Sequence, residues 1–99
     1  MKETLQIIGK YTVESSSGWK VEIPSFEVLI YEEEGKSIRL SLEDRPDAQG
    51  ELEWIIYMPE AWRWNECIDE ILTQGKITEI LNRIDLAFWK LDLKIKKIV

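Results

Sequence analysis

The 99-residue sequence contains no histidine and a single cysteine, Cys67. Without histidine it lacks the commonest general base and the commonest metal ligand, which excludes Ser-His-Asp and Cys-His catalytic arrangements. One cysteine cannot close an internal disulfide, and with no histidine it excludes the ordinary zinc sites. We interpret Cys67 as a small apolar residue of the core. These absences predict a protein that holds no metal ion and no other cofactor.

Glycine and long apolar segments are also scarce. The five glycines are isolated, so no glycine-rich loop is available to bind a phosphate group. No apolar run approaches the ~20 residues that cross a bilayer. Residues 1–12 lack the apolar segment and the cleavage site of a signal peptide. Together with the lone cysteine, these features favour a reduced, cytoplasmic location and argue against a membrane as partner.

Acidic residues outnumber basic ones, 19 to 13, which gives a net charge of −6. A field of this sign repels the nucleic acid backbone and favours a basic protein as partner. Pairs such as Glu51 with Glu53, or Glu43 with Asp44, could in principle perform acid–base catalysis. Such pairs arise by chance in a chain this acidic, and its length leaves little material for a substrate cleft. We therefore expect a protein that is not an enzyme.

The first sixty residues alternate between apolar and polar positions over short stretches, which predicts strands. The pair Glu34-Gly35 predicts a tight hairpin turn, and the acidic run 32–34 is interpreted as its solvated tip. A glycine at position 9 suggests a kink within the first strand. The segments expected to form strands are 4–14, 19–23, 26–31, 37–42 and 51–57.

The C-terminal part changes to helical spacing. Apolar residues at 77, 80, 81, 84, 88 and 91 predict a helix over 77–91 that begins near Thr73 or Gly75. The tail, residues 93–99, alternates again and predicts a last strand whose lysines protect a sheet edge. We therefore predict one α+β domain over residues 1–99. It has an antiparallel sheet of about five N-terminal strands plus a C-terminal strand, with one main helix packed on one face.

Trp62, Arg63 and Trp64 form the first group of candidate contact residues, with Glu60 and Glu66 beside them. In an extended segment the two tryptophans share a face and could bind a protein, or stack a sugar or a base. In a helix they lie about 160° apart, and one of them packs inward. The apolar residues that follow at 68, 71 and 72 have helix-like spacing and favour a lid folded over the core.

Leu86 and Trp89 form the second group. On a helical wheel they lie about 120° to 180° away from the apolar face that meets the sheet. Such a pair is either covered by another segment, for which residues 60–72 are the obvious candidate, or exposed as a contact surface. An exposed pair suits a protein partner. It also suits a homodimer in which this helix face and the lysine-bearing last strand form a twofold interface.

Three segments between residues 26 and 99 carry a family resemblance: VLIYEEEGKSIRLSLE, EWIIYMPEAWRW and GKITEILNRIDLAFWKLDLKIKKIV. In this order they resemble the immunity protein 74 family of bacterial polymorphic toxin systems. Two positions depart from the family pattern, because no proline follows the loop tryptophan and Leu91-Asp92 stands where a glycine is expected. The matching positions are Tyr31, Glu43, Tyr57, Trp64, Ile77, Ile80 and Ile84.

The resemblance implies a small cytoplasmic protein that neutralises a toxin by direct binding, without catalysis and without a cofactor. The acidic balance is compatible with this role, because an acidic domain is steered rapidly onto a basic surface. Tryptophan and arginine, which the first group combines, are the side chains most enriched among interface hot spots. The expected function is therefore protein binding, with self-association and small-ligand stacking as alternatives.

Overall fold

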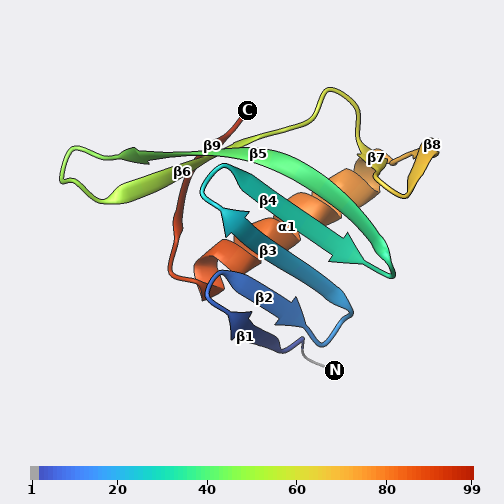
Figure 1. Cartoon of the computed structure of the whole chain (residues 1–99), viewed down its shortest axis with the longest axis horizontal. Coiled ribbons are helices and arrows are strands. Elements are labelled where there is room, and N and C mark those ends of the chain that lie inside the picture. The colour runs from blue at the N-terminus through green and yellow to red at the C-terminus, as the bar shows by residue number, and fades with distance from the viewer. Residues whose placement is uncertain (1–2) are drawn as a thin grey trace.

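The computed structural model describes residues 3–99, which form a strongly curled β-sheet with one helix packed across one of its faces (Figure 1). This confirms the α+β class, with more strands than the sequence predicts. The elements in chain order are β1 (Leu5–Gly9), β2 (Thr12–Ser15), β3 (Trp19–Ser25), β4 (Val28–Glu33), β5 (Lys36–Pro46), β6 (Leu52–Tyr57), β7 (Arg63–Trp64), β8 (Cys67–Ile71), α1 (Gln74–Lys90) and β9 (Lys94–Ile98).

The main sheet has seven strands in the order β1-β2-β3-β4-β5-β6-β9. Neighbours from β1 to β6 run antiparallel, as predicted. The last strand, β9, runs parallel to β6, so the sheet is mixed rather than wholly antiparallel. The reason is the connection: α1 carries the chain back along the sheet, and a strand that follows such a crossover lies parallel to the strand before it.

The turns explain where the strands begin and end. Glu34 and Gly35 both have positive φ, of 49° and 76°, which confirms the predicted tight turn between β4 and β5. The expected single strand over 4–14 is two strands, because the chain turns at residues 10–11 and β2 pairs back on β1. The predicted irregularity at Gly9 is present as a register shift between Ile7 and Gly9.

One face of the sheet and one face of α1 enclose the core. Thr73 caps the helix, since its Oγ1 accepts a hydrogen bond from the Lys76 N–H over 3.2 Å. The predicted apolar face is confirmed at Ile80 and Ile84, and burial of each side chain contributes about 2 kcal/mol. The sheet contributes alternate residues of its central strands: Trp19, Val21, Ile23, Leu29, Tyr31, Ile38, Leu40, Leu42, Trp54 and Ile56.

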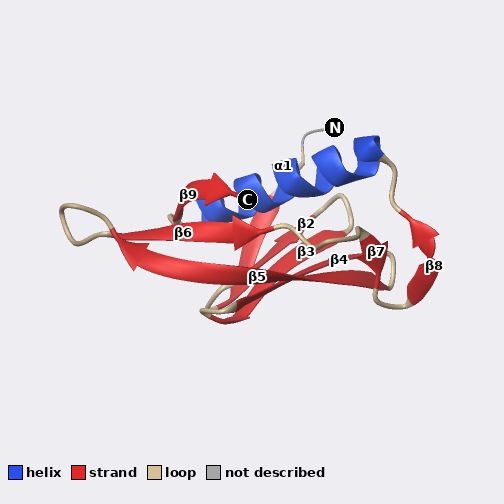
Figure 2. Cartoon of the chain, turned by 90° about the horizontal axis from the view of Figure 1, so that it is seen from above, coloured by secondary structure: helices blue, strands red, loops and turns tan. Residues whose placement is uncertain are grey.

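The short hairpin formed by β7 and β8 projects beyond one end of the sheet, near the start of α1 (Figure 2). The helix-like spacing of residues 68, 71 and 72 therefore misleads, because the segment is extended. Within β8, Ile68 and Ile71 are exposed, and Cys67 is exposed as well, so its interpretation as a core residue is wrong. Only Leu72, next to the helix cap, reaches the core.

Candidate protein-interaction surface

Trp64 belongs to the core. Its side chain is 2% exposed, and its ring stacks on Tyr31 with centroids 6.4 Å apart. Tyr31 stacks in turn on Trp19, also at 6.4 Å, so three rings from separate elements form one column. The prediction that Trp64 anchors a partner is therefore wrong in this structure, and no exposed pair of rings is present there to stack a sugar or a base. The lid interpretation accounts for Trp64.

The neighbours of Trp64 hold the hairpin in place. Trp62 is half-buried against the core, and its C=O accepts a hydrogen bond from the Leu72 N–H. Arg63 is exposed and donates to the C=O of Ile68 over 3.3 Å, across the hairpin. The Glu66 carboxylate accepts from both the N–H and the hydroxyl of Ser37 at the start of β5, which lowers its pKa.

Of this first group, then, Trp64, Glu66 and Arg63 make internal contacts. Glu60 is exposed, in the loop that precedes β7. Trp64, which the sequence marks as an aromatic anchor, is the buried member of the group. This part of the chain exposes polar side chains at Glu60 and Arg63 and apolar ones at Ile68 and Ile71 of β8, which are 64% and 69% exposed.

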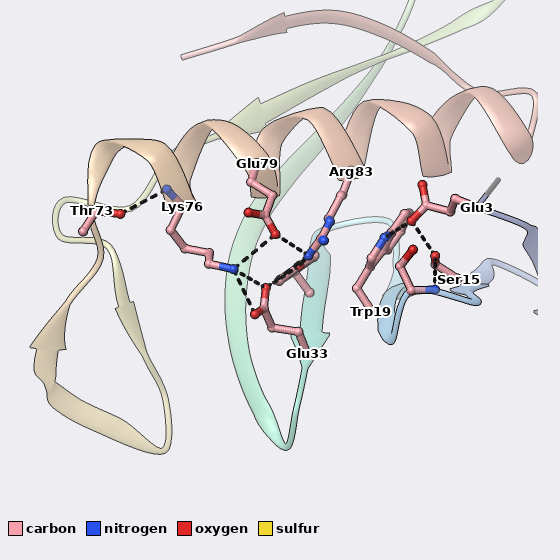
Figure 3. A network of polar contacts seen from close by, with 10 residues as sticks. Glu3, Ser15, Trp19, Glu33, Thr73, Lys76, Glu79 and Arg83 are labelled. Carbon is pink, nitrogen blue, oxygen red and sulfur yellow. Dashed lines mark hydrogen bonds and ion pairs between the residues drawn. The ribbon is translucent and has the colours of Figure 1, made fainter. Parts of the chain in front are cut away.

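Glu33, in the run interpreted as a solvated tip, is instead the centre of a polar network beneath α1 (Figure 3). Its carboxylate accepts from the Tyr31 hydroxyl at 2.6 Å, from Lys76 at 3.1 Å and from Arg83 at 3.3 Å. The Glu33 side chain is only 13% exposed. Burial opposes its ionisation, yet the hydrogen bonds from Tyr31 and Lys76 leave the pKa of Glu33 below its usual range. Because Glu33 lies on β4 and both Lys76 and Arg83 lie on α1, these contacts fasten the helix to the sheet. Glu79 pairs with the same two cations within the helix.

A second polar contact fixes the N-terminal segment. Glu3 accepts hydrogen bonds from the Ser15 hydroxyl and the Trp19 Nε1–H, both over 2.6 Å (Figure 3). The bond from Ser15 lowers the pKa of Glu3. This contact holds the residues that lead into β1 beside the C-terminal half of α1.

Leu86 and Trp89, the second predicted group, are exposed on the outer side of α1. Trp89 is 73% exposed and Leu86 40% exposed, so the expectation that residues 60–72 cover them is wrong. The hairpin lies at the other end of the helix (Figure 1). Instead the two side chains border a shallow depression of about 480 Å³ whose opposite wall includes Leu5.

Strand β1 extends this apolar surface. Leu5 pairs with Ser15 and Ile7 pairs with Val13, and since Ser15 and Val13 are buried, Leu5 and Ile7 point to the side of the sheet on which α1 lies. Ile7 is nevertheless 47% exposed. We call the surface formed by Leu5, Ile7, Leu86 and Trp89 the helix–edge patch.

The helix–edge patch adjoins an open sheet edge. Among residues 3–99, no strand pairs with the outer side of β1. The strand reads LQIIG and carries no charge, whereas β9, at the opposite edge, reads KIKKI. Lysines on an edge strand discourage pairing with another chain, and an uncharged apolar edge permits it. The patch therefore combines an exposed tryptophan with backbone groups that are free to pair.

No group of three or more metal-ligating side chains is found among residues 3–99. Nor does the described part of the chain include a helix of the length and hydropathy that a membrane span requires. Comparison with family models, with curated proteins and with solved structures finds no match to this chain.

Sequence reasoning missed the contribution of β1 to this surface. The strand follows an alternating pattern like its neighbours, so nothing in its own residues marks it as an edge. Ile7 and Ile8 point to opposite faces of the strand, and both are about half exposed. Two adjacent isoleucines are no signal of an edge, because Ile55 and Ile56 of β6 are both buried.

Proposed function

We propose that this protein is a non-catalytic binding domain that acts by direct contact with another protein through the helix–edge patch. One observation carries the proposal: an uncharged, open edge strand lies beside an exposed tryptophan on the adjoining helix. Backbone groups of an edge strand give affinity to an added strand, and neighbouring apolar side chains give it specificity. Trp89 is placed to serve as the aromatic anchor of such an interface.

Charge favours a basic partner. The chain carries −6 overall, and the patch itself is nearly neutral, with Glu3 engaged internally and Lys90 at its border. An acidic body around a neutral, apolar contact steers a basic protein towards the site and leaves few charges to desolvate on binding. The resemblance of residues 26–99 to the immunity protein 74 family supports a narrower form of the proposal, in which that partner is a toxin that this chain neutralises.

The test is a search for a toxin-like chain encoded by a neighbouring reading frame, followed by calorimetry of its binding and by rescue of growth on co-production. Trp89→Ala is expected to weaken binding by about thirtyfold, a typical loss for an aromatic hot spot. Trp62→Ala is the control, because Trp62 is half-buried against the core and directly precedes β7, and the β7–β8 hairpin lies at the far end of α1 from Trp89 (Figure 1). Equal affinities for wild type and Trp89→Ala would show that the helix–edge patch does not bind this partner. If neither wild type nor any variant binds, a toxin would be excluded as the partner.

The same patch could instead bind a second copy of this chain. Two β1 strands that pair antiparallel would bring no charges together, because LQIIG has none, and each Trp89 would pack on the partner copy. Sedimentation velocity over a wide range of concentrations distinguishes the two functions. A strict monomer excludes the homodimer, whereas a dimer that Ile7→Lys dissociates would favour it over a separate partner.

A further inference from the structure

Among residues 3–99, β1 is the outermost strand on one side of the sheet, and its hydrogen bonds show which backbone groups point outward (Figure 1). The Ser16 N–H donates to the Thr4 C=O over 2.9 Å, so Thr4 faces β2 through its backbone. In an antiparallel pair of strands, successive residues face the partner and the opposite side alternately. Gln6 therefore also faces β2, and the N–H and C=O groups of Leu5 and Ile7 point to the open side.

The pairing of β2 with β3 agrees with this assignment. The Ile23 N–H donates to the Tyr11 C=O over 2.9 Å. By the same alternation Val13, two residues further along, faces β3 through its backbone. Ile7 lies opposite Val13 and therefore has no backbone partner on β2. Because no strand of residues 3–99 pairs with the other side of β1, these backbone groups are open to an added strand.

A strand added at this edge presents its side chains to two different surfaces. A residue opposite Leu5 or Ile7 points to the same face of the sheet as its partner, and that face carries α1. Its neighbours there are the side chains of the helix–edge patch, with Trp89 73% exposed. A residue opposite Gln6 points to the other face, away from the helix. Apolar residues therefore fit the first two positions.

The outer face beside this edge carries an acidic side chain that is free to bind a cation. Gln6 pairs with Glu14 of β2, which is exposed and forms no ion pair with any residue in the range 3–99. Lys20, opposite Glu14 on β3, lies 3.4 Å from Glu32 instead. Two strand spacings, about 10 Å, separate a residue opposite Gln6 from Glu14, and a lysine and a glutamate side chain together span that distance. A basic residue therefore fits the position opposite Gln6.

We propose that the partner of the helix–edge patch supplies an extended strand of alternating apolar and basic residues, which pairs with β1 and enlarges the sheet. This inference rests on the proposed function and names the segment that the partner contributes. Its apolar side chains lie opposite Leu5 and Ile7, beside Trp89, and a basic side chain lies opposite Gln6. The register shift between Ile7 and Gly9 ends the regular edge, so the added strand spans about five residues. A second copy of β1 is the poorer occupant, because LQIIG has no basic residue.

Two peptides of opposite charge test the proposal on the whole chain. Acetyl-Val-Lys-Val-Lys-Val-amide has the proposed pattern, and acetyl-Val-Glu-Val-Glu-Val-amide keeps the apolar positions with acidic residues between them. The measurement is amide hydrogen exchange by nuclear magnetic resonance, which in the free protein should be fast at Leu5 and Ile7 and slow at Gln6. We expect the lysine peptide to slow exchange at Leu5 and Ile7 by about tenfold or more. It should also bind about tenfold more tightly than the glutamate peptide, because its charge is opposite to that of Glu14.

The remaining outcomes separate this inference from the proposed function. If the lysine peptide shifts the Trp89 indole resonance, assigned by its loss in Trp89→Phe, without slowing exchange in β1, strand pairing is overturned and the helix–edge patch stays a contact surface. Equal affinities of the two peptides would overturn the basic position. If neither peptide binds, strand addition is overturned, whereas Trp89→Ala with the toxin-like chain still decides the proposed function. Slow exchange at Leu5 and Ile7 that depends on the concentration of the free protein would show that a second copy occupies the edge.

Ile7→Pro and Ile7→Val form a matched pair that tests the backbone contact directly. Proline removes an N–H that bonds to no other strand of the sheet, and edge strands accept proline at such a position. Valine keeps both the N–H and a branched apolar side chain. We expect Ile7→Pro to bind the lysine peptide about tenfold more weakly than Ile7→Val, with urea unfolding as the check that both variants fold. Equal affinities of two folded variants would overturn pairing through the backbone, and if Ile7→Pro does not fold, hydrogen exchange in the wild type decides.

Discussion

Trp64 and Trp89 lie in two regions that the sequence marks equally as contact surfaces, and they have opposite environments: 2% against 73% exposed. Trp64 sits in a short extended segment that the chain can bring back over the end of the sheet, where its ring completes a column with Tyr31 and Trp19. Trp89 lies on a regular helix whose opposite face is buried in the core. Only one face of this helix packs on the sheet, so an aromatic residue on the other face stays exposed unless another segment of the chain covers it.

Substitution at Trp64 should give the largest effect in this comparison. Trp64→Ala removes the end ring of the column and leaves a cavity against Tyr31, and we expect a loss of about 3 to 5 kcal/mol in the free energy of unfolding. Urea unfolding followed by circular dichroism measures this loss. Trp64→Phe keeps an aromatic ring and should cost less. A loss below about 1 kcal/mol for Trp64→Ala would show that the hairpin does not close the core.

Glu33 lies between the two regions and tests whether the polar network fastens α1 to the sheet. Glu33→Gln weakens the bonds from Lys76 and Arg83, and we expect a loss of about 2 kcal/mol in the free energy of unfolding. Glu34→Gln is the matched control one residue along, at the exposed turn, with an expected change within about 0.5 kcal/mol. Equal losses in the two variants would contradict the role of the network.

The pH dependence of the same variant gives a second measurement. The folded state holds the pKa of Glu33 below its ordinary value of 4.5, so the folded state binds fewer protons than the unfolded state. The stabilisation is complete above that ordinary value and is lost as the pH falls through the lower, folded value. Wild-type stability should therefore decline below pH 4.5, and more steeply than that of Glu33→Gln. Parallel pH profiles would exclude a contribution from Glu33.

Of these substitutions, the one at Trp89 should have the smallest effect on the free energy of unfolding and the largest effect on the fraction of fluorescence that acrylamide quenches. Trp89→Phe is expected to change the free energy of unfolding by less than about 0.5 kcal/mol, because its side chain is mostly in solvent. It should nevertheless remove most of the fluorescence that acrylamide quenches readily, whereas Trp64→Phe should leave that fraction intact. If Trp89→Phe leaves the quenched fraction unchanged, the exposed tryptophan in solution is not the one on α1.

The local elements were largely predictable, since they depend on neighbouring residues. Alternation marked the central strands, the Glu34-Gly35 pair marked the turn, and the spacing from Ile77 onward marked the helix. The direction of β9 was not predictable from its own residues, because KIKKI pairs equally well in either sense. The parallel pairing follows from the path of α1 across the sheet.

The candidate sites also combine features that neighbouring residues predict with features that depend on distant segments. An unpartnered outer helix face was visible at Leu86 and Trp89, but the strand that completes the patch comes from the other end of the chain. Glu33 looked like one of three equivalent acids, and only the approach of Lys76 and Arg83 from a distant helix distinguishes it. Pairings across more than forty residues leave no local pattern.

What the sequence determined by itself is the class of molecule: an α+β fold without histidine, acidic overall, with a helix that has one apolar face. Periodicity and composition suffice for this, because both act through neighbouring residues and total charge. The tertiary structure alone decided which tryptophan is core and which is surface, which sheet edge is open, and which carboxylates are buried. These depend on contacts between distant segments, and the free energy of burying a side chain is set by what the fold brings against it.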